Sequence, residues 1–150
     1  MGPEKPYTTK QQGDACEMLV AAELTLAGVP ALKVPDGWPG YDVIAQPAHA
    51  RPQRISVKSY TFTTKSGDFI GYKRADGFDW LAVVILPGPG CEHRRIFIVP
   101  RDVADQRSYY AKRRDGQGIR VNKIMETFGD YENNFSLLSH EPVQPANRDR

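Results

Sequence analysis

The sequence has little of what marks a secreted or membrane-bound protein. None of its apolar runs approaches the ~20 residues that a membrane-spanning helix requires, and the first 14 residues lack the apolar core of a secretory signal. The composition, 40% hydrophobic and 25% charged, is ordinary for a soluble globular protein. We therefore expect a cytoplasmic protein with no membrane partner.

Cysteine and histidine are also scarce. Cys16 and Cys91 are too few for a disulfide framework, and neither belongs to a CxxC pair. The three histidines, His49, His93 and His140, show no ligand spacing and fall in expected loops. These patterns argue against a zinc site. No serine has histidine and acid partners at a meaningful spacing, so a serine hydrolase is unsupported as well.

The charge is distributed unevenly, although the net charge is only +2. Residues 51–123 carry 15 basic and 7 acidic side chains, whereas residues 1–50 carry 3 and 6 and residues 124–150 carry 2 and 5. A basic band between acidic flanks suits a polyanionic partner. A solvated basic surface explains the same band equally well.

Helical composition and β-type runs alternate along one domain that covers residues 1–150, with loose tails at about 1–9 and 139–150. Residues 11–28 predict a helix that is apolar on two sides and hence covered on both. Residues 103–113 predict a later helix capped by Asp102, and residues 115–121 a glycine-containing loop.

The strands are expected to form one sheet. Residues 80–86 are continuously apolar, as in a central strand, and residues 96–99 follow as its antiparallel hairpin partner. Shorter β-type runs lie at 31–34, 41–45, 55–62 and 69–72. The order predicts an α/β (α+β) fold with a mixed sheet of four to five strands flanked by helices.

The stretch from residue 41 to residue 58 places charges among β-branched residues. Alternation along a strand directs Ser56 and Lys58 to one face and the apolar residues between them to the other. If the two runs pair as a hairpin, Asp42 can approach Lys58. Charges are costly to bury without partners, so this arrangement indicates either a functional site or a salt bridge between neighbouring strands.

Together with Glu17 on the first helix, these residues resemble the PD-(D/E)xK nuclease superfamily, particularly its small resolvase-like and Mrr-like members. The resemblance covers roughly residues 13–100. Its motifs occur in order: an acid-bearing first helix, an acid-bearing strand, a strand ending in Ser56-Val57-Lys58, and two core strands. It implies a restriction-endonuclease-like fold.

The resemblance also implies a metal site and roles for its residues. Asp42 would be the central ligand of Mg²⁺ or Mn²⁺, Glu17 a second ligand, and the Val57 carbonyl a further one. Lys58 would act on the attacking water. Ser56 departs from the family pattern, because it stands where an acid is expected and a hydroxyl is a much poorer ligand for Mg²⁺ than a carboxylate.

Two functions follow from this resemblance. The first is a metal-dependent endonuclease that hydrolyses phosphodiester bonds in duplex or branched DNA, perhaps as a homodimer as in resolvase-like relatives. The second, motivated by Ser56, is a nuclease-fold module that binds nucleic acid or protein without cutting. An ion-pair cluster on an unrelated fold is a third interpretation. The candidate DNA contacts are Arg51, Arg54, Lys65, Lys73, Arg74, Arg113 and Arg114.

Overall fold

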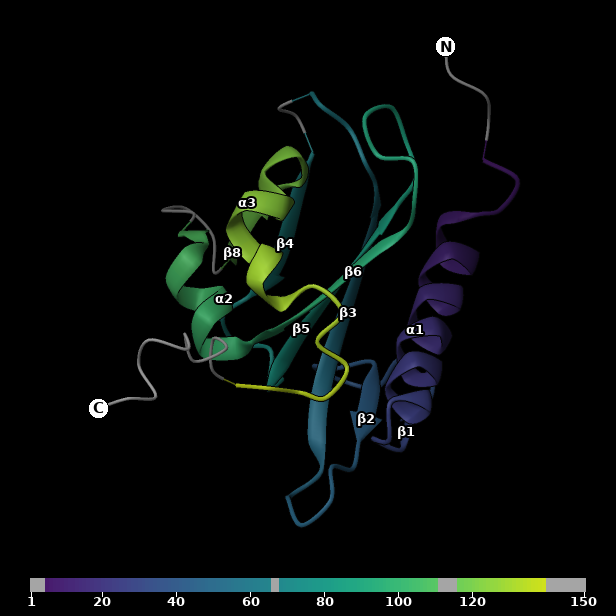
Figure 1. Ribbon diagram of the computed structural model, residues 1–150, viewed down its shortest axis with the longest axis vertical. Coiled ribbons are helices and arrows are strands. Elements are labelled where there is room, and N and C mark those ends of the chain that lie inside the picture. The colour runs from purple at the N-terminus through teal and green to yellow at the C-terminus, as the bar shows by residue number, and fades with distance from the viewer. Residues whose placement is uncertain (1–4, 66–67, 111–115, 140–150) are drawn as a thin grey trace, which may run out of the picture.

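The computed structural model describes residues 5–65, 68–110 and 116–139 (Figure 1). The expected tails lie largely outside these ranges, as do Arg113 and Arg114. The elements in chain order are α1 (Thr9–Leu26), β1 (Ala31–Lys33), β2 (Val43–Ala45), β3 (Gln53–Thr61), β4 (Phe69–Lys73), β5 (Trp80–Leu86), β6 (Arg95–Pro100), α2 (Arg101–Arg107), β7 (Tyr109–Tyr110), β8 (Gly116–Arg120), η1 (Val121–Lys123), α3 (Ile124–Phe128) and η2 (Gly129–Tyr131).

The main sheet has five strands in the order β1-β2-β3-β5-β6. Its pairs are antiparallel except β3 with β5, which run parallel, so the sheet is mixed as predicted. The expected hairpin of β5 and β6 is present, with Val83 opposite Phe97. The two strands of the charged stretch also pair, with Val43 opposite Ile55.

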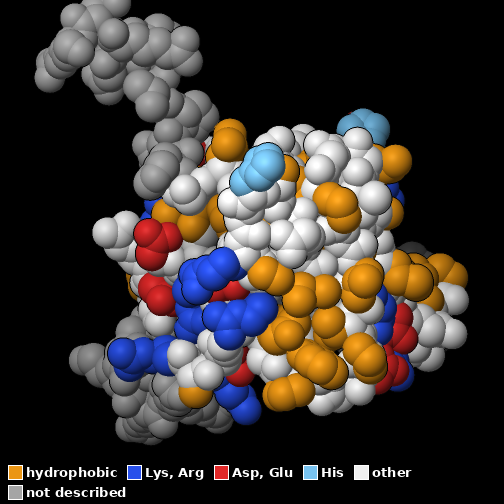
Figure 2. Space-filling view, turned by 90° about the horizontal axis from the view of Figure 1, so that it is seen from below, with side chains coloured by type: hydrophobic (Ala, Val, Ile, Leu, Met, Phe, Trp, Pro, Cys, Tyr) orange, Lys and Arg blue, Asp and Glu red, His pale blue; other side chains and the backbone are white. Residues whose placement is uncertain are grey.

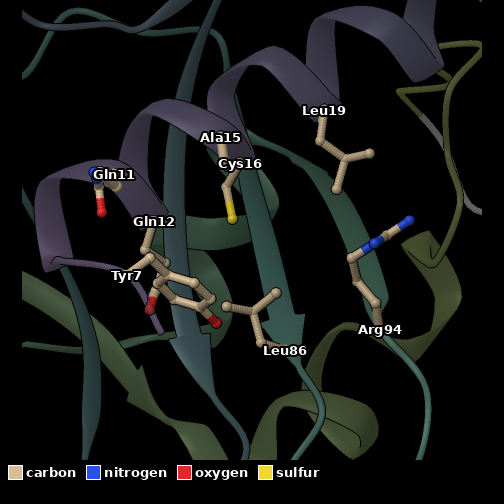
Figure 3. Close-up of a pocket in the computed structure, with 8 residues that line it drawn as sticks. All are labelled: Tyr7, Gln11, Gln12, Ala15, Cys16, Leu19, Leu86 and Arg94. Atoms are coloured by element: carbon tan, nitrogen blue, oxygen red, sulfur yellow. The ribbon is translucent and has the colours of Figure 1, made fainter. Parts of the chain in front are cut away.

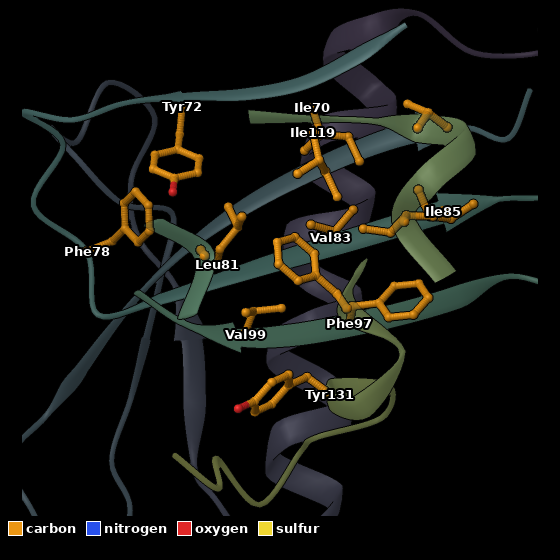
Figure 4. Close-up of a cluster of buried hydrophobic side chains, with 14 of the residues drawn as sticks. Ile70, Tyr72, Phe78, Leu81, Val83, Ile85, Phe97, Val99, Ile119 and Tyr131 are labelled. Carbon is orange, nitrogen blue, oxygen red and sulfur yellow. The ribbon is translucent and has the colours of Figure 1, made fainter. Parts of the chain in front are cut away.

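Each face of the main sheet carries its own apolar core. On one face α1 packs against alternate residues of the sheet, including Ile55, Ala82 and Ile98. On the other face, Leu81, Val83, Phe97 and their neighbours pack under α2, α3 and a second sheet (Figures 1 and 4). Because every second residue of β5 points to each side, its continuous apolar run serves both cores.

Helix α1 begins two residues earlier than expected. Thr8 and Gln11 form a capping box, in which the Thr8 hydroxyl accepts from the Gln11 amide. The expectation that both sides of this helix are covered is wrong, because Met18 and Leu26 are 55% and 83% exposed. A single face is buried, and its residues are Gln12, Cys16, Val20, Ala21 and Leu24.

The region after β6 differs most from the prediction. Helix α2 ends at Arg107 rather than near residue 113, and Tyr109–Tyr110 forms strand β7. The expected loop at 115–121 contains strand β8, which joins β4 and β7 in a three-stranded sheet. Gly118 explains why glycine occurs within this strand: a Cβ there would collide with the Ile70 carbonyl and the Phe69 ring.

Within the part of the chain that the structure describes, no helix combines the length and apolarity needed to cross a bilayer.

Candidate active site

Asp42 lies where strands β2 and β3 separate. Its backbone amide donates to the Ile55 carbonyl at 2.9 Å, and its carboxylate oxygen Oδ2 accepts from the Val57 amide at 2.8 Å. The β2–β3 ladder ends at Val43, whereas β3 continues to Thr61. The side chain thus takes the place of a backbone carbonyl at the end of the ladder, which fixes one carboxylate oxygen at the sheet edge.

Glu17 approaches Asp42 from helix α1. Its side chain is 17% exposed and lies within hydrogen-bonding reach of the Asp42 carboxylate. Burial and the neighbouring Asp42 charge raise the pKa of Glu17 to about 7, while Lys33 acts in the opposite direction. At neutral pH the two carboxyl groups therefore hold a proton between them for much of the time, as closely spaced acids do.

The raised pKa of Glu17 predicts a pH-dependent penalty on folding. Because the folded-state pKa lies above that of an exposed glutamate, stability is fully present below about pH 4 and is lost as the pH rises through about 7. Glu17→Gln should match the wild type at pH 4 and exceed its unfolding free energy by about 1–2 kcal/mol at pH 8.5, since water screens part of the repulsion. Urea unfolding in chelator at both pH values measures this.

The matched control for this experiment is Glu23→Gln on the same helix. It changes the same functional group without touching the acid pair, so its difference from the wild type should stay constant with pH. Equal pH profiles for Glu17→Gln and the wild type would contradict the prediction.

A polar cleft of about 190 Å³ adjoins the acid pair. In it, Lys33 Nζ lies 3.0 Å from Asp36 and 3.4 Å from Glu17. Trp38 and Tyr41 meet edge to face at one wall, with ring centroids 6.2 Å apart. The sequence analysis missed Lys33 because it fell in a short expected strand without a motif. The lining residues are Lys10, Asp14, Glu17, Lys33, Val34, Pro35, Asp36, Gly37, Trp38, Tyr41 and Asp42.

Ser56 and Lys58 lie on the other face of the main sheet. Their partners on β5 are Leu81 and Val83, which belong to the core away from α1, and paired residues share a face. Ser56 is buried, and Lys58 is half-buried with no ion-pair partner among the described residues. The structure thus brings Glu17 to Asp42 at the sheet edge, whereas Lys58 reaches that edge from the opposite side.

The donor set suits a hard divalent cation with an incomplete shell of protein ligands. Carboxylate oxygens are the ligands that Mg²⁺ prefers, and Mg²⁺ commonly uses one or two carboxylates, several waters and substrate phosphates. Glu17 and Asp42 meet that requirement. No cluster of three or more His, Cys, Asp or Glu side chains that could hold a metal occurs among the described residues, so a closed protein cage is not formed there.

The basic residues predicted to contact DNA differ in how free they are. Arg54 forms a two-pronged ion pair with Asp79, at 3.1 and 3.2 Å. Lys65, Lys73 and Arg51 are exposed, and Arg74 uses its carbonyl to accept from Arg101. Figure 2 shows Lys and Arg side chains gathered beside an apolar area at the end of the molecule seen from below.

A second, more apolar cavity of about 390 Å³ lies between the first half of α1 and the ends of β5 and β6 (Figure 3). Cys16 points into it from the helix, and burial raises the pKa of that thiol. None of the predicted site residues lines it. The lining residues are Tyr7, Gln11, Gln12, Ala15, Cys16, Leu19, Leu86 and Arg94.

No protein-family model and no curated protein matches the chain. Its structure is similar to that of a bacterial homing endonuclease, with a TM-score of 0.57, 19% sequence identity, and coverage of 87% of this chain and 90% of the other. A Holliday junction resolvase from Archaeoglobus fulgidus gives a TM-score of 0.49 at 16% identity, covering 79% and 88%. The chain therefore has a fold of the restriction-endonuclease-like type, as expected from its motifs.

Proposed function

We propose that the chain is a metal-dependent DNA endonuclease with its site at Glu17 and Asp42. The observation that carries this proposal is the contact between the two carboxyl groups. A helix and a strand distant in sequence hold them together although their mutual repulsion opposes folding. Such an arrangement is typical of a functional site, because a divalent cation bound between the acids would relieve the repulsion.

Each site residue has a role that its position allows. Val57 fixes Oδ2 of Asp42 through its amide, which leaves the other oxygen free to bind a cation. Glu17 supplies a second carboxylate from the α1 side. A bound Mg²⁺ would neutralise the phosphodiester and lower the pKa of a water molecule. Lys58, unpaired and on the adjoining segment of β3, can orient that water or stabilise charge on the phosphate.

DNA is the substrate that the remaining features favour. The exposed Arg51, Lys65 and Lys73 can contact phosphates, and the similar fold is that of a homing endonuclease. Both duplex and branched DNA are candidate substrates. The full chain should be incubated with supercoiled plasmid and with a four-way junction, in Mg²⁺ or Mn²⁺ and in excess chelator. We expect cleavage with metal and none with chelator; equal cleavage in both would contradict the proposal.

The second candidate function is a nuclease-fold module that binds DNA without cutting it. Buried Ser56, which cannot replace a carboxylate ligand, favours this alternative. It predicts salt-sensitive DNA binding that survives Asp42→Ala, with no turnover in any metal. Robust metal-dependent cleavage by the wild type would exclude it.

A further inference from the structure

A lysine from strand β1 occupies the polar cleft beside the acid pair. The Lys33 ammonium lies 3.0 Å from Asp36 Oδ1, 3.4 Å from Glu17 Oε2 and 3.9 Å from Asp14 Oδ1. It also donates to the Val34 carbonyl at 3.4 Å. Three carboxylates and a carbonyl thus surround one cation, whose side chain is only 22% exposed. This environment resembles the oxygen shell of a hard metal ion.

A neighbouring lysine in the same network provides a natural comparison. Lys10 pairs with Asp14 at 3.2 Å and with Asp36 at 3.0 Å, but its side chain is 68% exposed. Within the described ranges, Lys33 forms an ion pair with Glu17 and Lys10 forms none. The two lysines share acidic partners and differ in their contact with the candidate ligand.

We propose that Lys33 is a positioning residue that competes with the divalent cation for the Glu17 carboxylate. This inference rests on the proposed function. Without metal, Lys33 neutralises Glu17 and holds it in the cleft beside Asp42. When a cation binds the acid pair, Lys33 gives up Glu17 and keeps Asp36 and the Val34 carbonyl. Loss of an ion pair and proximity of two cations lower metal affinity, so the site fills most readily when DNA phosphates add ligands.

Binding of Mn²⁺ to the full chain without DNA tests this competition. Free Mn²⁺ is measured by electron paramagnetic resonance at pH 8.5, where protons on Glu17 interfere little. Lys33→Met should lower the Kd for Mn²⁺ about five- to tenfold, the size expected for one ion pair near the surface. Lys33→Arg, which keeps the charge, and Lys10→Met, the matched control, should stay within about twofold of the wild type.

A second measurement does not depend on a substitution that disturbs folding. In the wild type, adding Mg²⁺ should shift the ¹⁵N resonance of the Lys33 ammonium and leave that of Lys10 in place. If the wild type binds Mn²⁺, Asp42→Asn does not, and Lys33→Met binds as the wild type does, the role of Lys33 is refuted while the proposed function stands. If neither the wild type nor Lys33→Met binds Mn²⁺, both proposals fall.

Discussion

Replacing Asp42 with asparagine is expected to lower the rate of DNA cleavage by about a thousandfold or more. The substitution removes the negative charge nearest to Glu17 and thus one of two carboxylate ligands. It preserves local structure, because the asparagine carbonyl oxygen can still accept from the Val57 amide, 2.8 Å from Oδ2 in the wild type. Plasmid nicking at a fixed Mg²⁺ concentration measures the rate, and Mn²⁺ titration measures the accompanying loss of metal affinity.

The control for this variant is Asp130→Asn. Asp130 is 53% exposed and pairs with Arg107 on the α2 and α3 side of the molecule, so it removes one acid without touching the cleft. Its cleavage rate should stay within about twofold of the wild type. If Asp42→Asn, shown to be folded by circular dichroism, cuts as fast as Asp130→Asn, the acid pair is not the catalytic site.

The main sheet could be predicted from the sequence because its strongest signals are local. A continuous apolar run can be satisfied only where both faces are covered, which places β5 at the centre, and the breakers between β5 and β6 require a hairpin. The region after β6 could not be predicted in the same way. Tyr109 and Tyr110 suit a strand only because Gly118 and Gln117 lie opposite them, and that pairing is tertiary.

The candidate site was predictable in part. Glu17 and Asp42 stood out through their family-like motifs, and the fold brings them together. Lys33 gave no such signal, because nothing in a three-residue strand shows that its ammonium will reach an acid sixteen positions earlier on α1. Ion pairs between elements depend on how a helix packs on a sheet, and that packing is encoded in the apolar residues rather than in the charged ones.

Ser56 shows how strand alternation limits what the departure from the family pattern can mean. It shares the face of Lys58 and pairs with Leu81, so it is buried under the core on the side away from α1. An acid in that environment would need the cation or Lys58 as a partner, because a buried unpaired carboxylate is costly. With serine there, the charge that Lys58 carries is left uncompensated by β3 and is available to a phosphate or a water molecule.

Lys58→Met is therefore expected to reduce DNA cleavage about 100- to 1,000-fold while leaving Mn²⁺ affinity unchanged. Methionine retains most of the apolar stem, which packs in a half-buried position on β3, and removes only the ammonium. Because Lys58 has no ion-pair partner among the described residues, the variant leaves no carboxylate unpaired there and should unfold within about 1 kcal/mol of the wild type. Single-turnover cleavage and Mn²⁺ titration separate the two effects.

Two further variants decide what the effect on Lys58 means. Lys123→Met removes an exposed lysine that pairs with Glu126 on the same side of the main sheet, and it should cut at nearly the wild-type rate. Lys58→Arg keeps the charge but not the compact ammonium, so it should recover DNA binding more fully than cleavage. If Lys58→Met loses metal affinity together with activity, Lys58 supports the site structurally; if it cuts as the wild type does, hydrolysis at the acid pair proceeds without this lysine and its assigned role is wrong.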